Sequence, residues 1–272
     1  MAIGAGLERN FAIRVDIDTV KGLVDGVPRV LDLCEDLGIR TTFFSCVGRD
    51  TAARAFLRSP RIARHAAVNP LRKYGLGEIV GSLKGLRFAD HTDIFRRIKD
   101  SDHEIELHGY DHVEWVNHIR KCDAEGTERM ISRGIEEFER ILGSRPRAFA
   151  SPAFEVTSHV LKAEEKLGFR YAGDYRVEGD CIPFRPDDSG VLQIPVNAPL
   201  IEDLVARGLS GGEILNLLAD LVRNNSLTVI YIHACYEPRV QRDLLRTVVS
   251  TCMEEAEPLT LGEVFRSWSP SE

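Results

Sequence analysis

Apolar and polar residues alternate regularly along the chain, and this pattern predicts strands and helices in turn. Over residues 11–17 every second residue is apolar, which is the period of a β-strand. Apolar residues at helical spacing then predict a helix over residues 20–37, which Gly38 ends. A second strand is expected over residues 40–47. Because one helix joins the two strands directly, we predict a βαβ unit with parallel strands and a right-handed crossover.

The same alternation resumes at Ile94 and continues to the C-terminal part of the chain. Strands are expected over residues 104–107, 147–151, 169–172, 191–196 and 229–233, and helices over residues 125–142, up to Leu167, 212–223 and 239–253. About seven strands that alternate with helices predict a closed or nearly closed (β/α) barrel, in which catalytic residues lie at the C-terminal ends of the strands. We expect residues 1–272 to form a single domain of the α/β class.

Residues 51–87 depart from this rhythm. They hold eight basic residues and one acidic residue, Glu78, so that a segment of charge +7 lies inside a chain of net charge −7. Apolar residues broken by Pro60 and Pro70 predict short amphipathic helices. Two interpretations stay open, a helical insert whose arginines face water, or a surface that binds phosphates or anionic lipid.

Composition narrows the class of protein. No apolar run is long enough to span a membrane, and the first residues reach charge too early for a signal peptide, so we expect a soluble, cytoplasmic protein. The six cysteines form no Cys-x-x-Cys pair, as expected of reduced thiols. A net charge of −7 argues against nucleic-acid binding, and neither of the first two strands is followed by a glycine motif for nucleotides.

Acidic and histidine residues gather at the predicted strand ends. Asp16 and Asp18 face one side of the first strand, His108 ends another strand with His112 on the turn beyond, and His233 ends a buried strand. Neutral imidazoles and a carboxylate are typical ligands of a catalytic metal with one open position. Each motif alone is also common among polar residues that face water or at a helix N-cap, and their occurrence together favours the metal site.

These residues resemble the motifs of the polysaccharide deacetylase superfamily, which are metal-dependent enzymes that remove acyl groups from amino sugars on a distorted (β/α)7 barrel. The resemblance implies that Asp16 is the general base and His233 the general acid. It implies one divalent metal held by Asp18, His108 and His112. Zinc is the first expectation, and iron, cobalt and nickel also suit two histidines and a carboxylate.

Further motifs are similar to those of the bacterial 4-deoxy-4-formamido-L-arabinose-phosphoundecaprenol deformylases. They are Arg14-Val-Asp-Ile-Asp-Thr19, Phe43-Phe-Ser-Cys-Val-Gly48, Tyr74-Gly-Leu-Gly77, Leu107-His-Gly-Tyr-Asp-His-Val-Glu-Trp115, Pro183-Phe-Arg-Pro186, Gln193-Ile-Pro-Val196 and Ile232-His-Ala-Cys-Tyr-Glu237. This similarity implies a hydrolase that removes a formyl or acetyl group from an amino sugar on a polyprenyl phosphate, as in lipid A modification. The enzyme would then be peripheral on the inner face of the membrane and contact anionic lipid through residues 51–87. Alternatives are a deacetylase of soluble oligosaccharide, a small amide or imide hydrolase, and an inactive metal- and sugar-binding module, and the oligomeric state stays open.

Other residues of these motifs are candidates for substrate contact or for support of the site. They are Arg14, Thr19, Asp111, Trp115, Asp174, Arg185 and Glu237. The chain also departs from the superfamily after the fourth strand, where Arg-x-Pro-x-Gly is usual and the deformylases have Gly-Trp-Arg. Residues 150–155 read Ala-Ser-Pro-Ala-Phe-Glu and contain no arginine. Arg14, Arg176 and Arg185 are the candidates to replace the missing arginine.

Overall fold

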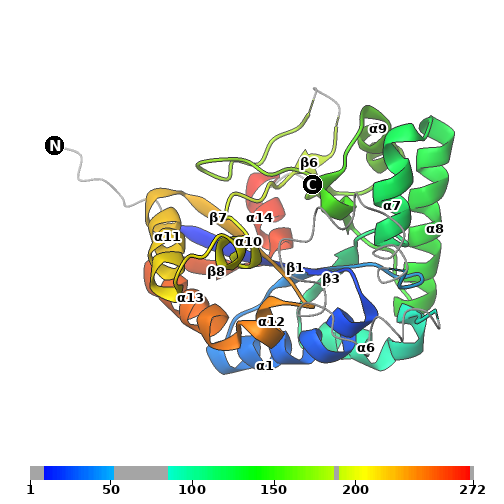
Figure 1. The fold of residues 1–272 in the computed structure, drawn as a ribbon. Helices are drawn as coiled ribbons and strands as arrows, with labels where there is room; N and C mark the ends of the chain where they lie inside the picture. The colour runs from blue at the N-terminus through cyan, green and yellow to red at the C-terminus, as the bar shows by residue number, and fades with distance from the viewer. Residues whose placement is uncertain (1–8, 52–84, 187–189, 270–272) are drawn as a thin grey trace.

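A curved sheet of parallel strands forms the centre of the molecule, and helices cover its outer face (Figure 1). The computed structural model describes residues 9–51, 85–186 and 190–269. Within these residues the strand order is β6-β5-β4-β3-β2-β1-β7, and β8 pairs with β1. The strands are β1 (Asn10–Ile17), β2 (Thr42–Ser45), β3 (Glu104–Leu107), β4 (Ala148–Phe149), β5 (Tyr171–Ala172), β6 (Leu192–Gln193), β7 (Leu227–His233) and β8 (Glu257–Leu259).

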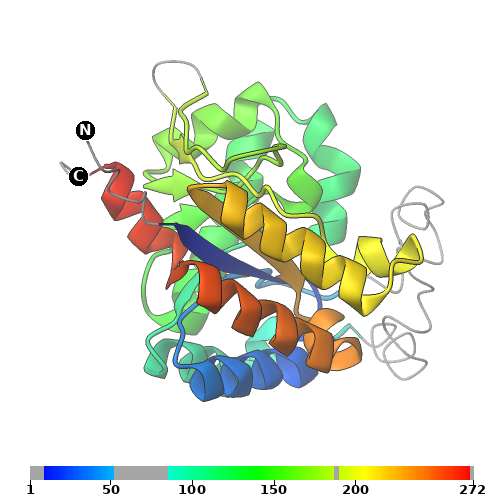
Figure 2. The ribbon, with the colours of Figure 1, turned by 90° about the vertical axis from the view of Figure 1, so that its left-hand side faces the viewer.

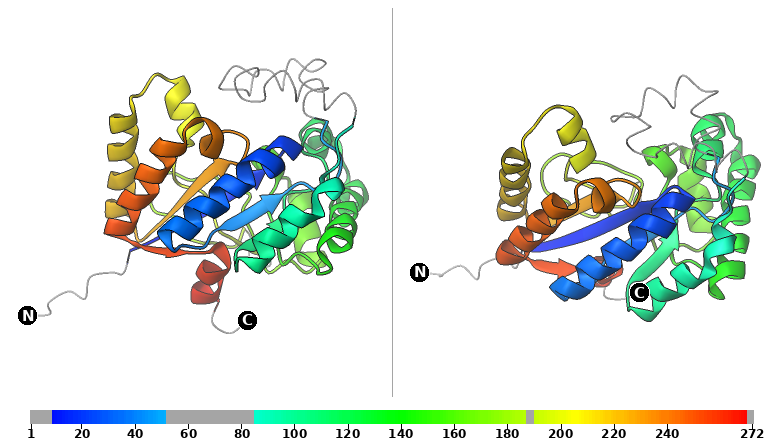
Figure 3. Two further views of the ribbon diagram at one scale, coloured as in Figure 1. Left: turned by 90° about the horizontal axis from the view of Figure 1, so that it is seen from below. Right: turned by 60° about the horizontal axis from the view of Figure 1, so that its bottom comes forward.

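Helices follow most of the strands and pack side by side around the sheet (Figures 2 and 3). The longer ones are α1 (Val27–Leu37), α6 (Thr92–Asp100), α7 (His112–His118), α8 (Ala124–Leu142), α9 (Ser158–Lys166), α10 (Ile201–Ala206), α11 (Gly211–Asn224), α13 (Arg242–Glu255) and α14 (Leu261–Trp268). Short helices η1 (Gly22–Gly26), η2 (Phe88–His91), η3 (Ile119–Lys121), η4 (Pro152–Phe154) and α12 (Glu237–Val240) lie between them. No helix of the described ranges is both long and apolar enough to cross a bilayer.

Alternate apolar residues of β1 belong to two different apolar clusters, one on each face of the strand. Phe11, Ile13, Val15 and Ile17 face outward and pack with the helices in one cluster. The opposite face of β1 looks into the barrel, where Ala12 joins a second cluster that includes Phe44, Val229 and Tyr231. The inner face becomes polar toward the C-terminal ends of the strands, and this is where the candidate site lies.

The barrel does not close by direct strand pairing between β6 and β7 in the part of the chain that is described. The Asn197 side chain bridges this gap, because its Oδ1 accepts from the Val229 amide at 2.7 Å and its Nδ2 donates to the Gly179 carbonyl at 2.8 Å. The Ala198 amide donates to the Val229 carbonyl at 3.2 Å. The predicted distorted barrel is therefore confirmed, with a polar side chain at its seam.

The structure also corrects the prediction in detail. His112 begins helix α7 and does not lie on a free turn. The helix expected over residues 239–253 is two helices, α12 and α13, which meet at Gln241. Elements β8 and α14 were not predicted.

The basic segment begins and ends next to the sheet. The Asp50 amide donates to the Leu86 carbonyl at 2.9 Å, so the chain leaves and returns at one place. Residues 52–84, which hold most of the predicted helical insert, lie outside the described residues. The single domain and its insert therefore stay predictions.

Candidate active site

The inner face of β1 carries Arg14, Asp16 and, just after the strand, Asp18. Arg14 and Asp16 are almost fully buried. Arg14 Nε donates to Asp16 Oδ1 at 2.7 Å and Arg14 Nη2 donates to Asp16 Oδ2 at 2.8 Å, and a third donor, Nη1, reaches the Gly173 carbonyl. This two-pronged pair fixes the Asp16 carboxylate in one orientation. Of the three candidates for the missing arginine, Arg14 is the one seen to hold Asp16.

Asp18, His108 and His112 converge from β1, the end of β3 and the start of α7. Asp18 Oδ1 lies 3.3 Å from His108 Nε2, and Asp18 Oδ2 lies 4.0 Å from His112 Nε2. One ligand atom from each of the three residues lies within 4.8 Å of the others. The predicted trio is therefore brought together.

The hydrogen bonds of His108 show that these residues fit a cation. Its Nδ1 lies 2.7 Å from the Ala150 carbonyl oxygen, which can only accept, so Nδ1 carries the proton and Nε2 of the neutral ring has a lone pair. That lone pair faces Asp18 Oδ1, a buried atom with no hydrogen-bond partner among the described residues. Two acceptors at this distance repel each other unless a proton or a cation lies between them. The donor set of two imidazoles and one carboxylate is that of a catalytic transition metal.

The charges of the site favour the same protonation states. Burial alone would raise the pKa of Asp18, but His112, His108 and His233 outweigh it and hold this pKa well below its usual value. Burial lowers the pKa of His112, partly offset by the negative charge of Asp18. Asp18 is thus ionised and His112 neutral near pH 7, as metal ligands must be.

His233 lies beside these residues at the end of β7. It is the register partner of Asp16, and its Nε2 is 3.7 Å from Asp18 Oδ2. Its Nδ1 is 3.1 Å from Oε2 of Glu202, a fully buried residue of α10. Glu237 accepts from the His233 amide at 2.9 Å and from the Glu202 amide at 3.0 Å. Glu202 therefore orients the ring and Glu237 holds the two backbones together.

Several predicted site residues support the backbone. Thr19 Oγ1 accepts from the Gly22 amide, and the Trp115 indole donates to the Glu155 carbonyl at 3.0 Å. Asp174 Oδ1 accepts from the Ser151 amide at 2.6 Å, so it shapes the loop after β4. Arg185 is exposed and donates to the Gly190 carbonyl in the hairpin before β6. The two carboxylate oxygens of Asp16 are held by Arg14.

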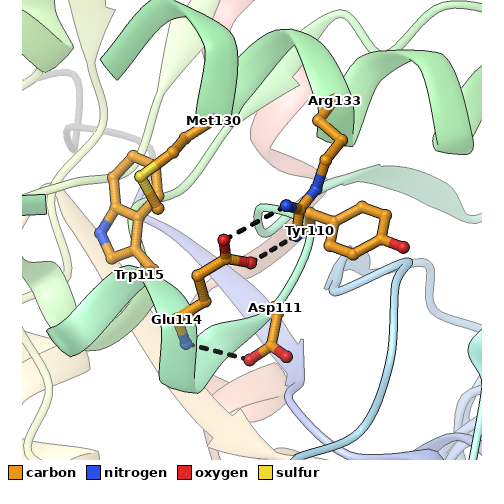
Figure 4. A pocket seen from close by; sticks show the side chains of 6 residues that line it. All are labelled: Tyr110, Asp111, Glu114, Trp115, Met130 and Arg133. Atoms are coloured by element: carbon orange, nitrogen blue, oxygen red, sulfur yellow. Dashed lines mark hydrogen bonds and ion pairs between the residues drawn. The ribbon is translucent and has the colours of Figure 1, made fainter. Parts of the chain in front are cut away.

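Asp111 is the N-cap of α7, the helix that His112 begins. Its Oδ1 accepts from the Val113 and Glu114 amides, and Thr51 donates to the same carboxylate. A pocket of about 10 Å³, room for one water molecule, lies behind this cap (Figure 4). Its lining is Tyr110, Asp111, Glu114, Trp115, Met130 and Arg133. This pocket is too small for a sugar, and it belongs to the support of His112.

Sequence reasoning missed Glu202, Phe154 and Tyr231. Glu202 lies in a short helix with no metal or catalytic motif, and only the fold brings it to His233. Phe154 follows Ala153 in η4, and both have positive φ, 57° and 54°. Two successive left-handed residues without glycine are rare and strain the backbone of this loop. Nothing in the local sequence predicts them.

Comparisons with known proteins agree with this geometry. Residues 11–172 match the polysaccharide deacetylase family. A probable 4-deoxy-4-formamido-L-arabinose-phosphoundecaprenol deformylase ArnD of Shewanella sediminis (strain HAW-EB3) is 27% identical over 257 residues, 89% of this chain and 81% of that protein.

Two solved structures show the same fold. One is a protein from Mycobacterium smegmatis that is named as a polysaccharide deacetylase. Its TM-score is 0.67, and it is 18% identical over 98% of this chain and 92% of its own. The other is the PuuE allantoinase, with a TM-score of 0.69 and 15% identity over 99% and 93%. Because the family match spans more than half of the chain, this protein belongs to the polysaccharide deacetylase family.

Proposed function

We propose that this protein is a metal-dependent hydrolase that removes a formyl or acetyl group from the nitrogen of an amino sugar carried on a polyprenyl phosphate. The observation that supports it most is the joint placement of Asp16, His233 and the Asp18-His108-His112 trio at one end of the barrel. The relative from Shewanella sediminis, named as a deformylase of such a lipid-linked sugar, supports the substrate class.

The chain supplies both proton transfers of amide hydrolysis. A metal held by Asp18, His108 and His112 would supply acidity to water and polarise the acyl oxygen. Asp16, held by Arg14, accepts the proton of the attacking water. His233, oriented by Glu202, donates a proton to the departing nitrogen, because an amine leaves poorly unless it is protonated. Zinc suits this donor set best, and iron, cobalt and nickel fit the same ligands.

A lipid-linked substrate places the enzyme at the cytoplasmic face of a membrane. Thr51, the first residue of the basic segment, donates to Asp111 beside His112. The segment of residues 51–87 therefore begins next to the candidate site, and we propose that its eight basic residues contact anionic headgroups. Co-sedimentation with anionic vesicles tests this: binding should fall with salt, and a protein that stays in the supernatant at low salt contradicts it.

The inactive binding module is the less favoured function, because Arg14 already does for Asp16 what the missing arginine would do. The decisive test is release of formate or acetate from acylated amino-sugar lipids by metal-loaded protein. Asp16→Asn and His233→Ala should each keep the metal and lose about 10²–10⁴-fold in turnover. A parent protein that releases neither acid from any acylamino sugar would leave the inactive module as the function.

A further inference from the structure

Arg176 is an exposed cation held in a fixed position beside the candidate site. Its guanidinium carbon lies 5.1 Å from the ring centroid of Tyr231 and 5.5 Å from that of Phe154. The described part of the chain offers its side chain no hydrogen bond or ion pair, although the protein carries an excess of acidic residues. Stacking on two rings fixes the plane of the guanidinium and uses none of its N–H donors, which can bind an anion.

The elements around Arg176 place it on the catalytic side of the barrel. It follows the C-terminal end of β5, and its backbone forms a parallel bridge with Val196. The two left-handed residues of η4 turn the Phe154 ring between Arg176 and Arg14, whose guanidinium carbon is 4.9 Å from the same ring. Arg14 and Arg176 thus stack on one aromatic side chain, but only Arg14 is engaged with Asp16.

Tyr231 connects Arg176 to the proton donor. It lies two residues before His233 on the inner face of β7, and the two rings meet edge to face with centroids 5.7 Å apart. Phe154 packs against Tyr231 in the same way, with centroids 5.4 Å apart. One aromatic ring therefore separates the guanidinium from the imidazole that would protonate the leaving nitrogen.

We infer that Arg176, seated on Phe154 and Tyr231, binds the phosphate that is attached to the amino sugar. This inference rests on the proposed function. In a 4-acylamino sugar linked through its anomeric carbon, the amide is attached at C4 and the phosphate at C1, which lie at opposite ends of the pyranose ring. When the amide nitrogen faces His233, the sugar covers the aromatic pair and its phosphate reaches Arg176. A guanidinium suits this role because it binds phosphate oxygens with two N–H donors.

The test compares a substrate that carries the phosphate with one that lacks it. They are the butyl phosphodiester of 4-formamido-4-deoxyarabinose and its methyl glycoside, assayed by formate release. Arg176→Gln should raise KM for the diester roughly 10- to 100-fold, the loss of a hydrogen bond to a charged group, with little change in kcat. Its kcat/KM for the methyl glycoside should equal that of the parent. Arg176→Lys should bind the diester more tightly than Arg176→Gln does, because it keeps the positive charge but lacks the planar pair of N–H donors.

Arg170→Gln is the matched control. Arg170 is also exposed and stacks on an aromatic ring, Phe265 at 4.9 Å, but it precedes β5 and so lies at the opposite end of the strand. Arg170→Gln should leave KM and kcat for both substrates unchanged. Equal losses for both substrates in Arg176→Gln, or no loss for either, would overturn the role in phosphate binding.

Binding of the deformylated product separates this inference from the proposed function. The butyl phosphodiester of 4-amino-4-deoxyarabinose and inorganic phosphate are titrated into the metal-loaded parent and Arg176→Gln by calorimetry. Weaker binding of both probes to the variant supports the phosphate site even when no formate is released. Unchanged binding overturns it whether or not the parent is a deformylase.

Discussion

Arg14 and Asp16 lie two residues apart on the inner face of β1, and the guanidinium of one holds both carboxylate oxygens of the other at 2.7 and 2.8 Å. Neither side chain is more than 4% exposed. Phe44 and Phe154 cover the guanidinium, with centroids 5.1 and 4.9 Å from its central carbon. Residues 150–155 contain no arginine, and Asp16 is held instead by an arginine of its own strand.

The first prediction concerns this pair. Arg14→Lys keeps the positive charge but cannot contact both oxygens, so kcat should fall at least 10-fold while the metal is retained. Arg14→Gln leaves the Asp16 charge buried without its partner, which should cost about 3–5 kcal/mol of unfolding free energy. Steady-state assays and urea denaturation measure the two effects. Full activity in Arg14→Lys would show that the fork does not position the base.

The second prediction concerns the proposed metal ligands. His108→Ala and Asp18→Asn should each weaken metal affinity by about 10-fold or more, because each removes one of three protein ligands. His118→Ala is the control, since this histidine is exposed on the same helix as His112 and binds the Glu114 carbonyl. Elemental analysis after dialysis decides, and full occupancy in His108→Ala would contradict the assignment.

The parts of the site that the sequence predicts are those that a strand carries locally. Asp16, Asp18, His108 and His233 follow apolar runs, and parallel strands bring their C-terminal ends to one edge. The Glu202 carboxylate beside His233 could not be predicted in this way, because only the fold brings Glu202 close to His233. The sequence also does not distinguish a residue that binds substrate from one that caps a helix. Asp111 would have the same neighbours in sequence in either role, and the structure shows that it accepts from the first amides of α7.

The outer elements follow the same logic. The long helices were predicted because their apolar stripes are local, and α8 ends at Gly143 with φ of 68° as a glycine C-cap does. Strands β4, β5 and β6 have only two paired residues each, so their alternation is too short to fix their bounds. Strand β8 was missed because Pro258 lies in it.

The third prediction concerns Glu202 as a positioning residue. Glu202→Gln should keep the metal and lower kcat at least 10-fold with KM nearly unchanged, because the His233 ring loses the carboxylate that orients it. Asp203→Asn, the next residue of α10, is the matched control and should retain activity. Equal turnover in Glu202→Gln and the parent would show that His233 does not need this partner.

The fourth prediction concerns Gly26 in the π-helical turn η1. A Cβ at this position would lie 1.8 Å from the Ala234 carbonyl oxygen, next to His233. Gly26→Ala must therefore push the backbone at Ala234 and His233 away. We expect a loss of about 1–3 kcal/mol in unfolding free energy and a loss of about 100-fold in kcat. Gly212→Ala meets no atom within 4 Å and should be neutral or slightly stabilising. Wild-type kcat in Gly26→Ala would show that this contact does not hold His233.

The fifth prediction concerns Glu106, a buried residue of β3. Burial raises its pKa from 4.5 to about 7, although its carboxylate accepts from the Arg147 and Ala148 amides. The folded state thus binds a proton that the unfolded chain releases above pH 4.5. The stability due to this group is complete below that pH and is lost as the pH rises through 7, a change on the order of 3 kcal/mol.

Urea denaturation from pH 5 to 8 should show this loss in the parent and a flatter profile in Glu106→Gln. Glu136→Gln, at an exposed position of α8, should follow the parent, and parallel profiles for Glu106→Gln and the parent would remove Glu106 as the titrating group.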